Sequence, residues 1–290
     1  MTTSYFRPET NPGYEVPEEM LAVWDVQLAL ADKLMEVCRK HGLQIWMEGG
    51  TLLGAVRHEG FIPWDDDIDF AMMRDDYDRL CQLAAGEFEA PYFWQTTYNE
   101  KDFLCGHAIL RDKRTTCVKR EDCGRRFCQG IGIDIFVMDG VPSTAVGYAL
   151  HRLTAKFLKF IVRTQMEKRY ALISHKVFFR WMEGLFRLNN VRRKKRVGLI
   201  SWRYRHKEIH LREYYEQTAM LNFAGRQWPA PARYLNYLSE YYGPDYMTPQ
   251  NVANFHGRKY LDAHNPWEES VARISQNPAI YEERLSRLYL

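Results

Sequence analysis

Long hydrophobic runs are missing from this sequence. No stretch of about 18 uncharged apolar residues occurs, so we predict no membrane-spanning helix. The N-terminus, MTTSYFRPETNPGYEVPEEM, has no basic start followed by an apolar segment, so we predict no secretory signal and expect the protein in the cytoplasm. Internal repeats and low-complexity tracts are also absent. Since 46% of the 290 residues are hydrophobic, the chain can bury a sizeable core, and we expect a folded protein of one large or two small domains.

Cysteine pairs of the C-x-x-C type are missing too, although the chain has six cysteines. Four of them lie between positions 105 and 128, where His107 could join them in a zinc site. Free, partly buried thiols in a reducing compartment are the interpretation that we favour.

Acidic residues are scarce between positions 151 and 213. This segment has 18 Lys and Arg but 4 Asp and Glu, a net charge of +14, whereas the remaining 22 basic and 33 acidic residues give −11. Its apolar residues recur at helical spacing with basic residues on the other side, which predicts basic amphipathic helices near 150–163 and 177–188, followed by the basic run Arg192 to Arg196.

Basic amphipathic helices are typical of proteins that bind anionic surfaces. We expect residues 150–212 to dock on an anionic membrane, which would place the protein peripherally on the inner face of the cell membrane. A solvated helical insertion is the second interpretation. Nucleic-acid binding, which a basic segment also favours, ranks last.

The chain is organised around residues 45–74. The apolar residues 45–47 are followed by Gly49 and Gly50, and apolar residues then recur at helical spacing from Thr51 to Val56. This pattern predicts a strand, a glycine turn and the start of a helix. Glycine lets the backbone approach a ligand closely, and the first turn of a helix offers unpaired N–H groups to an anion. We interpret the turn as a phosphate-binding site, although GGT alone is also typical of an ordinary turn.

Acidic residues then cluster after Pro63, at Asp65, Asp66, Asp67 and Asp69. Because side chains alternate between the two faces of a strand, Asp67 and Asp69 would point to the same side while the apolar residues between and after them enter the core. Carboxylates held together without a counter-charge repel each other, and a hard divalent cation such as Mg²⁺ removes that repulsion. The interleaved apolar residues argue against the alternative of a solvated acidic loop.

A further carboxylate, Asp134, interrupts the apolar run GIGIDIFVMD at 130–139. A charge in a buried strand is costly unless it is paired or binds a metal. We therefore predict that Asp134 joins Asp67 and Asp69 if their strands are neighbours; the alternative is an edge strand on which Asp134 faces water. Asp139, which precedes Gly140, is interpreted as a turn residue.

Other elements are predicted around these motifs. Helical spacing and end signals favour helices from about residue 17 to 40, from 74 to 86 and from 234 to 242. Aromatic and β-branched residues between 92 and 118 favour two or three strands.

The run GGTLLGAVRHEGFIPWDDDIDFAMMRDDY, residues 49–77, resembles the signature of the LicD family, whose relatives include fukutin-type glycan-modifying transferases. The stretches QGIGIDIFVMDGVP at 129–142 and YLNYLSEYYGPDYMTP at 234–249 are similar to the family as well. The resemblance implies an α+β, nucleotidyltransferase-like fold: a mixed sheet flanked by helices, here with a basic helical insertion. It also implies a basic residue near Arg111 that faces the donor phosphates, and a Tyr-Gly-x-x-Tyr pattern, here Tyr242 to Tyr246, that lines the cleft.

We accordingly divide the chain into four parts. Residues 1–19 form a flexible lead, and residues 20–142 form the nucleotidyltransferase-like catalytic core. Residues 143–215 form the basic helical segment, and residues 216–290 form a C-terminal helical region that packs on the core.

The resemblance implies transfer of phosphocholine or a related phospho-alcohol from a nucleotide donor, and the residues suggest metal-dependent phosphotransfer. We expect Asp67, Asp69 and Asp134 to hold Mg²⁺ or Mn²⁺ against a CDP-linked donor, with CDP-choline as the first choice. The acceptor would be a sugar hydroxyl of a cell-surface glycan, such as lipopolysaccharide or teichoic acid, or of its lipid-linked precursor, and CMP would leave. Two alternatives stay open: a nucleotidyltransferase that releases pyrophosphate, and a non-catalytic nucleic-acid-binding module. The residues expected to bind the donor phosphates are Gly49, Gly50, Thr51, Arg57 and Arg111.

Overall fold

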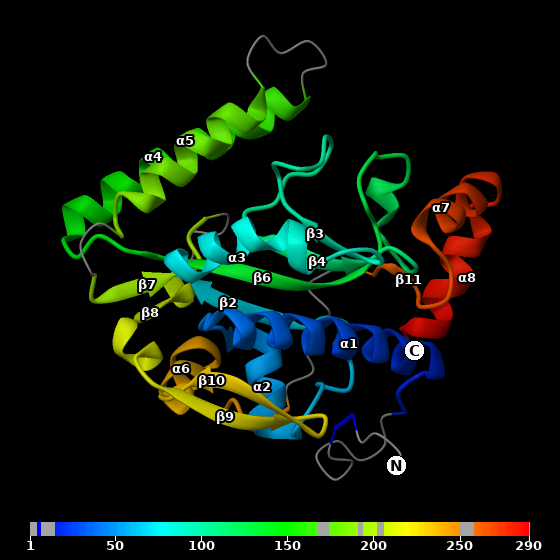
Figure 1. Ribbon diagram of the computed structural model, residues 1–290, viewed down its shortest axis with the longest axis horizontal. Coiled ribbons are helices and arrows are strands. Elements are labelled where there is room, and N and C mark those ends of the chain that lie inside the picture. Colours follow the sequence, from blue (N-terminus) through cyan, green and yellow to red (C-terminus); the bar gives the residue numbers. More distant parts are fainter. Residues whose placement is uncertain are drawn as a thin grey trace.

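A mixed sheet forms the centre of the molecule (Figure 1). The computed structural model describes residues 5–6, 15–167, 174–190, 194–201, 206–249 and 258–289. The strands of this sheet are β1 (Trp46–Met47), β2 (Asp69–Met73), β3 (Tyr92–Gln95), β4 (Ala108–Asp112), β6 (Ile131–Gly140), β7 (Arg196–Gly198) and β8 (Ile209–Leu211). Their order is β1-β2-β6-β4-β3, and β7 and β8 extend the sheet from the end of β6. β2 and β6 are parallel, whereas the other pairs in the sheet are antiparallel.

Helices flank this sheet, which confirms the predicted α+β class. α1 (Glu18–His41) packs against β4 and β6, and α3 (Arg74–Glu87) packs against β2 and β6. α1 ends at Gly42, whose φ of 63° is a left-handed conformation that glycine adopts readily. Both helices match their predicted bounds to within one residue, and the predicted strands between 92 and 118 are β3, β4 and β5 (Thr116–Val118).

The predicted glycine turn is wrong in one respect, because the helix begins earlier. α2 (Gly49–His58) starts at Gly49 itself, directly after the extended residue Glu48. Gly49 has a φ of 52°, so the chain reverses at this single residue and both glycines lie in the first turn of the helix. The N–H groups of that turn therefore lie immediately after β1, where that of Gly49 donates to Tyr237 Oη at 3.3 Å.

Asp139 is not a turn residue, in contrast to the prediction. It lies within β6 and is fully buried. Arg74, at the start of α3, donates from Nε to Asp139 Oδ1 at 2.8 Å and from Nη2 to Asp139 Oδ2 at 2.5 Å. Asn190 Nδ2 donates to Asp139 Oδ1 at 2.6 Å. Because both of its oxygens are paired, the Asp139 carboxylate is accommodated within a buried strand. The turn was predicted from the following glycine alone.

The basic segment forms a helical hairpin that projects from the sheet (Figure 1). α4 (Ala145–Glu167) packs on α5 (His175–Arg187), and α5 starts two residues before its predicted position. Buried apolar side chains of the two helices form a small core together with Val141, Ile200 and Ile209. Arg192 and Arg193 of the predicted basic run, and most of the predicted lead 1–19, lie outside the described residues.

The C-terminal part contributes strand pairs and helices that share a core with the mixed sheet. β9 (Thr218–Phe223) pairs with β10 (Arg226–Pro231), and α6 (Tyr234–Tyr242) follows with its predicted bounds. β11 (Tyr260–Asp262) pairs with β5 and precedes α7 (Trp267–Gln276) and α8 (Ala279–Leu288). Apolar side chains of α1, β10, α6 and α8 share one core with the sheet. Short 3₁₀ helices span Arg120–Asp122, His206–Glu208 and Arg212–Tyr215.

Candidate active site

A cavity of about 1110 Å³ lies beside the mixed sheet. Residues of α2, β4, β6, α6 and the segment 62–69 line it. Of the eight residues that the sequence predicted for the site, seven line this cavity, and Thr51 does not. The structure therefore brings together residues from the glycine motif, the acidic run and the Asp134 strand.

The carboxylates of Asp65, Asp67, Asp69 and Asp134 are among the lining residues, and we call these four the acidic cluster. β2 and β6 run in parallel, and their register places Asp69 beside Asp134. Asp67 lies two positions before Asp69, and the side-chain oxygens of residues 65 to 67 lie within 4.8 Å of one another. The parallel pairing of β2 with β6 is thus the feature that joins the two acidic motifs.

Burial and like charges make ionisation of this cluster costly. Burial raises the pKa of Asp69 well above its usual value, and the charges of Asp67 and Asp134 raise it further. Burial, followed by the charge of Asp67, raises the pKa of Asp65 in the same way. Asp69 Oδ1 is buried and has no hydrogen-bond partner among the described residues. A cation bound between these carboxylates would offset both the burial and the repulsion.

Asp134 has a cationic neighbour of its own. His107 Nε2 lies 3.4 Å from Asp134 Oδ1. Burial opposes ionisation of Asp134, but the charge and the hydrogen bond of His107 outweigh it and lower the pKa of Asp134. Burial also opposes protonation of His107, yet Cys105 and Asp134 raise the pKa of His107 to about 10. Asp134 therefore ionises more readily than Asp65 or Asp69.

The cysteines and His107 do not assemble the zinc site that the sequence left open. All six cysteines are free thiols in the structure. Cys105 Sγ lies 3.3 Å from His107 Nδ1, but two ligands are fewer than a zinc site uses. In the described part of the chain, the grouping of three or more metal-binding side chains is formed by residues 65 to 67.

Asp66, the middle residue of the acidic run, has structural partners. Its Oδ1 accepts from Lys259 Nζ at 3.1 Å, and its Oδ2 accepts from Tyr289 Oη at 2.7 Å. These bonds tie the C-terminal segment to the loop that carries the other carboxylates. Asp66 is 2% exposed, and both of its oxygens are engaged, so we leave it out of the predicted metal set.

The glycines approach the carboxylates closely. A Cβ atom at Gly50 would lie 2.8 Å from Asp65 Oδ2, and a Cβ atom at Gly49 would lie 3.8 Å from Asp69 Oδ2. Thr51, by contrast, is buried below the cavity, where its Oγ1 accepts from the backbone N–H of Asp69 at 2.8 Å. The start of α2 thus borders the acidic cluster, and Thr51 holds Asp69 in position.

The predicted arginines line the cavity from two different elements, α2 and β4. Arg57, near the end of α2, donates to His58 Nε2 and to the carbonyl oxygen of Tyr246, at 2.8 and 3.0 Å. Arg111 of β4 donates from Nη1 to the carbonyl oxygen of Gly130 at 2.6 Å. In the β4–β6 register, Arg111 pairs with Gly132, two positions from Asp134, so both side chains point to the same face of the sheet.

Glu48 is a cavity residue that sequence reasoning missed. It is 3% exposed, and Tyr237 Oη donates to its Oε1. Its position between the apolar residues 45–47 and two glycines could have indicated a site residue. An acidic residue at the end of a buried strand needs a partner or a ligand. Its partner Tyr237, in α6, had no such signal.

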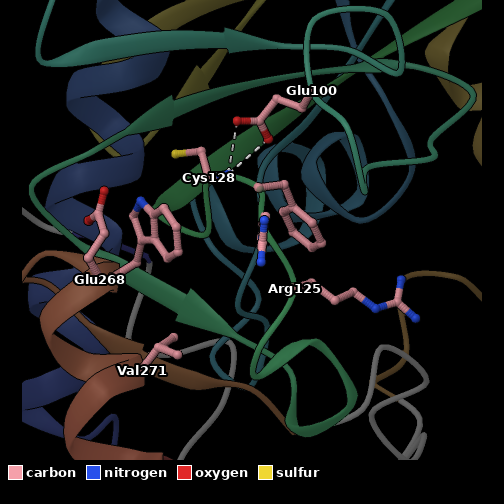
Figure 2. A pocket seen from close by; sticks show the side chains of 8 residues that line it. Glu100, Arg125, Cys128, Glu268 and Val271 are labelled. Carbon is pink, nitrogen blue, oxygen red and sulfur yellow. Dashed lines mark hydrogen bonds between the residues drawn. The ribbon is translucent and has the colours of Figure 1, made fainter.

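A second, more open hollow of about 440 Å³ lies between the segment 125–128 and α7 (Figure 2). The backbone N–H of Cys128 donates to Glu100 Oε2 at 2.8 Å and fixes one wall. The hollow shares Arg125 and Phe127 with the large cavity, but none of the predicted site residues lines it. The candidate chemistry therefore belongs to the larger cavity.

Comparison with known proteins identifies the family. Residues 42–144 match the LicD/FKTN/FKRP nucleotidyltransferase domain. The lipopolysaccharide cholinephosphotransferase LicD of Haemophilus influenzae is 29% identical over 245 residues, which cover 77% of this chain and 89% of that protein. Residues 42–144 thus form a LicD-type domain, and the similarity to LicD extends over most of the chain. This confirms the resemblance seen in the sequence.

Other relatives match a shorter part of this chain at higher identity. Ribitol 5-phosphate transferase FKRP of Homo sapiens is 46% identical over 68 residues, which are 22% of this chain and 14% of that protein. An uncharacterized protein of Rickettsia prowazekii is 50% identical over 63 residues, 22% of this chain and 21% of that protein. The matched domain, 42–144, contains the glycines and the four carboxylates of the acidic cluster, whereas α4, α5 and α6 lie beyond it.

Proposed function

We propose that this protein transfers phosphocholine from CDP-choline to a sugar hydroxyl of a cell-surface glycan or of its lipid-linked precursor, with release of CMP. The observation that carries the proposal is the convergence of Asp65, Asp67, Asp69 and Asp134 in one cavity beside the first turn of α2. The choice of phosphocholine follows the Haemophilus influenzae relative, which is named a lipopolysaccharide cholinephosphotransferase.

The donor set fits a hard divalent cation. Its ligands would be carboxylate oxygens, and the buried, unpartnered Asp69 Oδ1 is an oxygen that a cation would satisfy. We propose that Asp67, Asp69 and Asp134, with Asp65 beside them, hold Mg²⁺ or Mn²⁺. Bound there, the ion would neutralise charge on the donor diphosphate.

The chain's own groups would orient the donor and remove a proton. The N–H group of Gly50, together with Arg57 and Arg111, would hold the phosphate oxygens, and Gly49, whose N–H donates to Tyr237 Oη at 3.3 Å, would let the backbone approach them. The sugar oxygen forms a bond to the phosphorus that bears the choline, the bond from that phosphorus to the CMP oxygen breaks, and a carboxylate accepts the hydroxyl proton. Because its pKa is lowered, Asp134 suits ion binding better than proton acceptance.

Product analysis tests this proposal. The folded protein, supplied with Mg²⁺ and a mixed glycan acceptor, is expected to release CMP from CDP-choline, and EDTA is expected to stop the release because the carboxylates then repel one another without a counter-ion. CMP and pyrophosphate are separated by chromatography. CDP-ribitol belongs in the same panel, since the Homo sapiens relative is named a ribitol 5-phosphate transferase.

Each outcome of that panel decides between the candidates. Pyrophosphate in place of CMP would favour a nucleotidyltransferase. Metal-independent release of CMP would remove the metal ion from the proposal. No release from any donor by folded protein would contradict the proposal and favour a binding role.

We also propose that the outer face of α4 docks on an anionic membrane. Leu150, Leu153, Phe157 and Phe160 recur at helical spacing, and each is between 61% and 66% exposed. Exposed basic residues lie along one flank of this stripe, at Arg152, Lys156 and Arg163. The described residues contain no helix with the length and hydropathy of a membrane span. An apolar stripe with a basic flank is complementary to acyl chains below anionic headgroups.

A second copy of the chain fits this face less well than a bilayer does. The segment 151–213 has a net charge of +14, so two such faces would repel each other. A lipid surface that contains phosphatidylglycerol supplies the opposite charge. The occupant that we infer is therefore the membrane.

Vesicle flotation measures this docking. The double variant Leu153→Gln, Phe157→Gln is expected to lower binding to phosphatidylcholine–phosphatidylglycerol vesicles about tenfold or more, because two large apolar side chains no longer leave water. The control is Leu235→Gln in α6, where Leu235 is 53% exposed away from the hairpin. Equal binding by the double variant and the control, or a wild-type dimer that the double variant loses in light scattering, would overturn the proposal.

A further inference from the structure

One end of the cavity combines buried carboxyl groups with tyrosine rings. Glu48 and Glu208 are each 3% exposed, and both line the cavity. Glu48 Oε1 accepts from Tyr237 Oη, while Glu48 Oε2 is buried without a hydrogen-bond partner among the described residues. Neither residue belongs to the acidic cluster that we assign to the metal.

Two rings of α6 complete this end of the cavity. Tyr241 and Tyr242 both line it, with ring centroids 4.7 Å apart and an interplanar angle of 55°. Tyr237 stacks on Tyr241 from below, with centroids 5.6 Å apart and an angle of 13°. Two inclined rings backed by a third give a concave, electron-rich surface.

This surface adjoins the proposed diphosphate site. A Cβ atom at Gly49 would lie 3.9 Å from Tyr242 Oη and 3.8 Å from Asp69 Oδ2, so the tyrosine and the metal carboxylate flank the same backbone position. The backbone N–H of Glu48 also donates to the carbonyl oxygen of Asp69 at 3.0 Å. A donor whose phosphates lie over the start of α2 therefore has Glu48 and the rings within reach of the group that it carries.

The ammonium group of Lys207 makes a cation–π contact with one of these rings. Lys207 Nζ lies 4.6 Å from the centroid of the Tyr241 ring. The Lys207 side chain is exposed, so it can leave the ring for solvent without a large loss of packing. The ring face is thus suited to a cation.

We propose that Glu48, Tyr241 and Tyr242 form the subsite for the head group of the donor, and that this head group is an organic cation of the quaternary ammonium class. This inference rests on the proposed function only for the cytidine diphosphate part of the donor. A quaternary ammonium has no N–H groups to satisfy, and ring faces and a nearby carboxylate attract it. A neutral polyol gains little from the rings and needs hydrogen-bond partners for its hydroxyls.

Calorimetric titration with two donors isolates the head group. CDP-choline and CDP-ribitol share cytidine and diphosphate, so the ratio of their dissociation constants reports the alcohol alone. The wild-type protein is expected to favour CDP-choline about tenfold or more. Glu48→Gln, which keeps an acceptor for Tyr237, and Tyr241→Leu are expected to bring the ratio near one. Tyr234→Leu is the matched control, because Tyr234 lies two turns earlier in α6 and does not line the cavity.

The outcomes separate this inference from the proposed function. If phosphocholine is transferred but Glu48→Gln and Tyr241→Leu keep the wild-type ratio, the subsite is wrong and the function stands. A wild-type preference for CDP-ribitol would also overturn the subsite. If CDP-choline is favoured, the ratio falls in both variants and no donor is turned over, the subsite stands and the proposed function fails. Lys207→Gln is expected to raise the preference for CDP-choline, because a competing ammonium is removed; a fall in the preference would contradict the subsite.

Discussion

Asp69→Asn is expected to lower the turnover number for CMP release by about a thousandfold or more while raising the thermal stability of the metal-free protein. The loss follows because an amide oxygen cannot supply the charge that would hold a divalent cation against the donor phosphates. The gain follows from the raised pKa of Asp69: its ionised form is costly in the folded state at neutral pH, and asparagine removes that cost. Turnover is measured at saturating Mg²⁺, and the melting temperature is measured in EDTA.

The opposite signs of these two effects make the test specific. A variant that fails to fold loses activity and stability together, whereas Asp69→Asn should lose activity alone. Asp112→Asn is the matched control, because Asp112 is also a buried carboxylate of the sheet but pairs with Arg114 and does not line the cavity. Wild-type turnover in Asp69→Asn, or an equal loss in Asp112→Asn, would remove Asp69 from the predicted metal set.

Local pattern explains why much of this fold could be predicted. The bounds of α1, α3 and α6 follow from helical spacing and from end signals within each segment. Alternation placed Asp69 opposite the core-facing Phe70, and Phe70 is fully buried. The sequence could not show that β2 and β6 are neighbouring strands, whereas the structure shows that they pair in parallel.

Polar contacts between distant residues explain what could not be predicted. Tyr237 bonds Glu48 across 189 positions, and Lys259 bonds Asp66 across 193 positions. No periodicity within a segment reports such a partner. A buried carboxylate in the sequence therefore indicates that some partner exists, but not whether that partner is a side chain or a ligand.

Asp139 is the clearest example of that ambiguity, and it yields a second large expected effect. Arg74→Met is expected to lower the free energy of unfolding by about 3–5 kcal/mol, because it leaves a buried carboxylate without its cation. Arg74 is 3% exposed and Asp139 is fully buried, so water reaches neither charge readily. Denaturant unfolding of wild type and variant measures the difference.

Replacing both partners should undo part of that loss. In Arg74→Met, Asp139→Leu no uncompensated carboxylate stays in β6, so the double variant is expected to be more stable than Arg74→Met alone. Glu183 and Asp78 also lie near Arg74, at 3.4 and 3.6 Å from Nη1, but both reach solvent and can be hydrated when the arginine is gone. The exposed Arg120–Glu282 pair is the control: Glu282→Gln is expected to change stability by about 0–1 kcal/mol. If Arg74→Met were no more harmful than Glu282→Gln, the buried pair would not be what secures β6 against α3, and the charge of Asp139 in that strand would need another explanation.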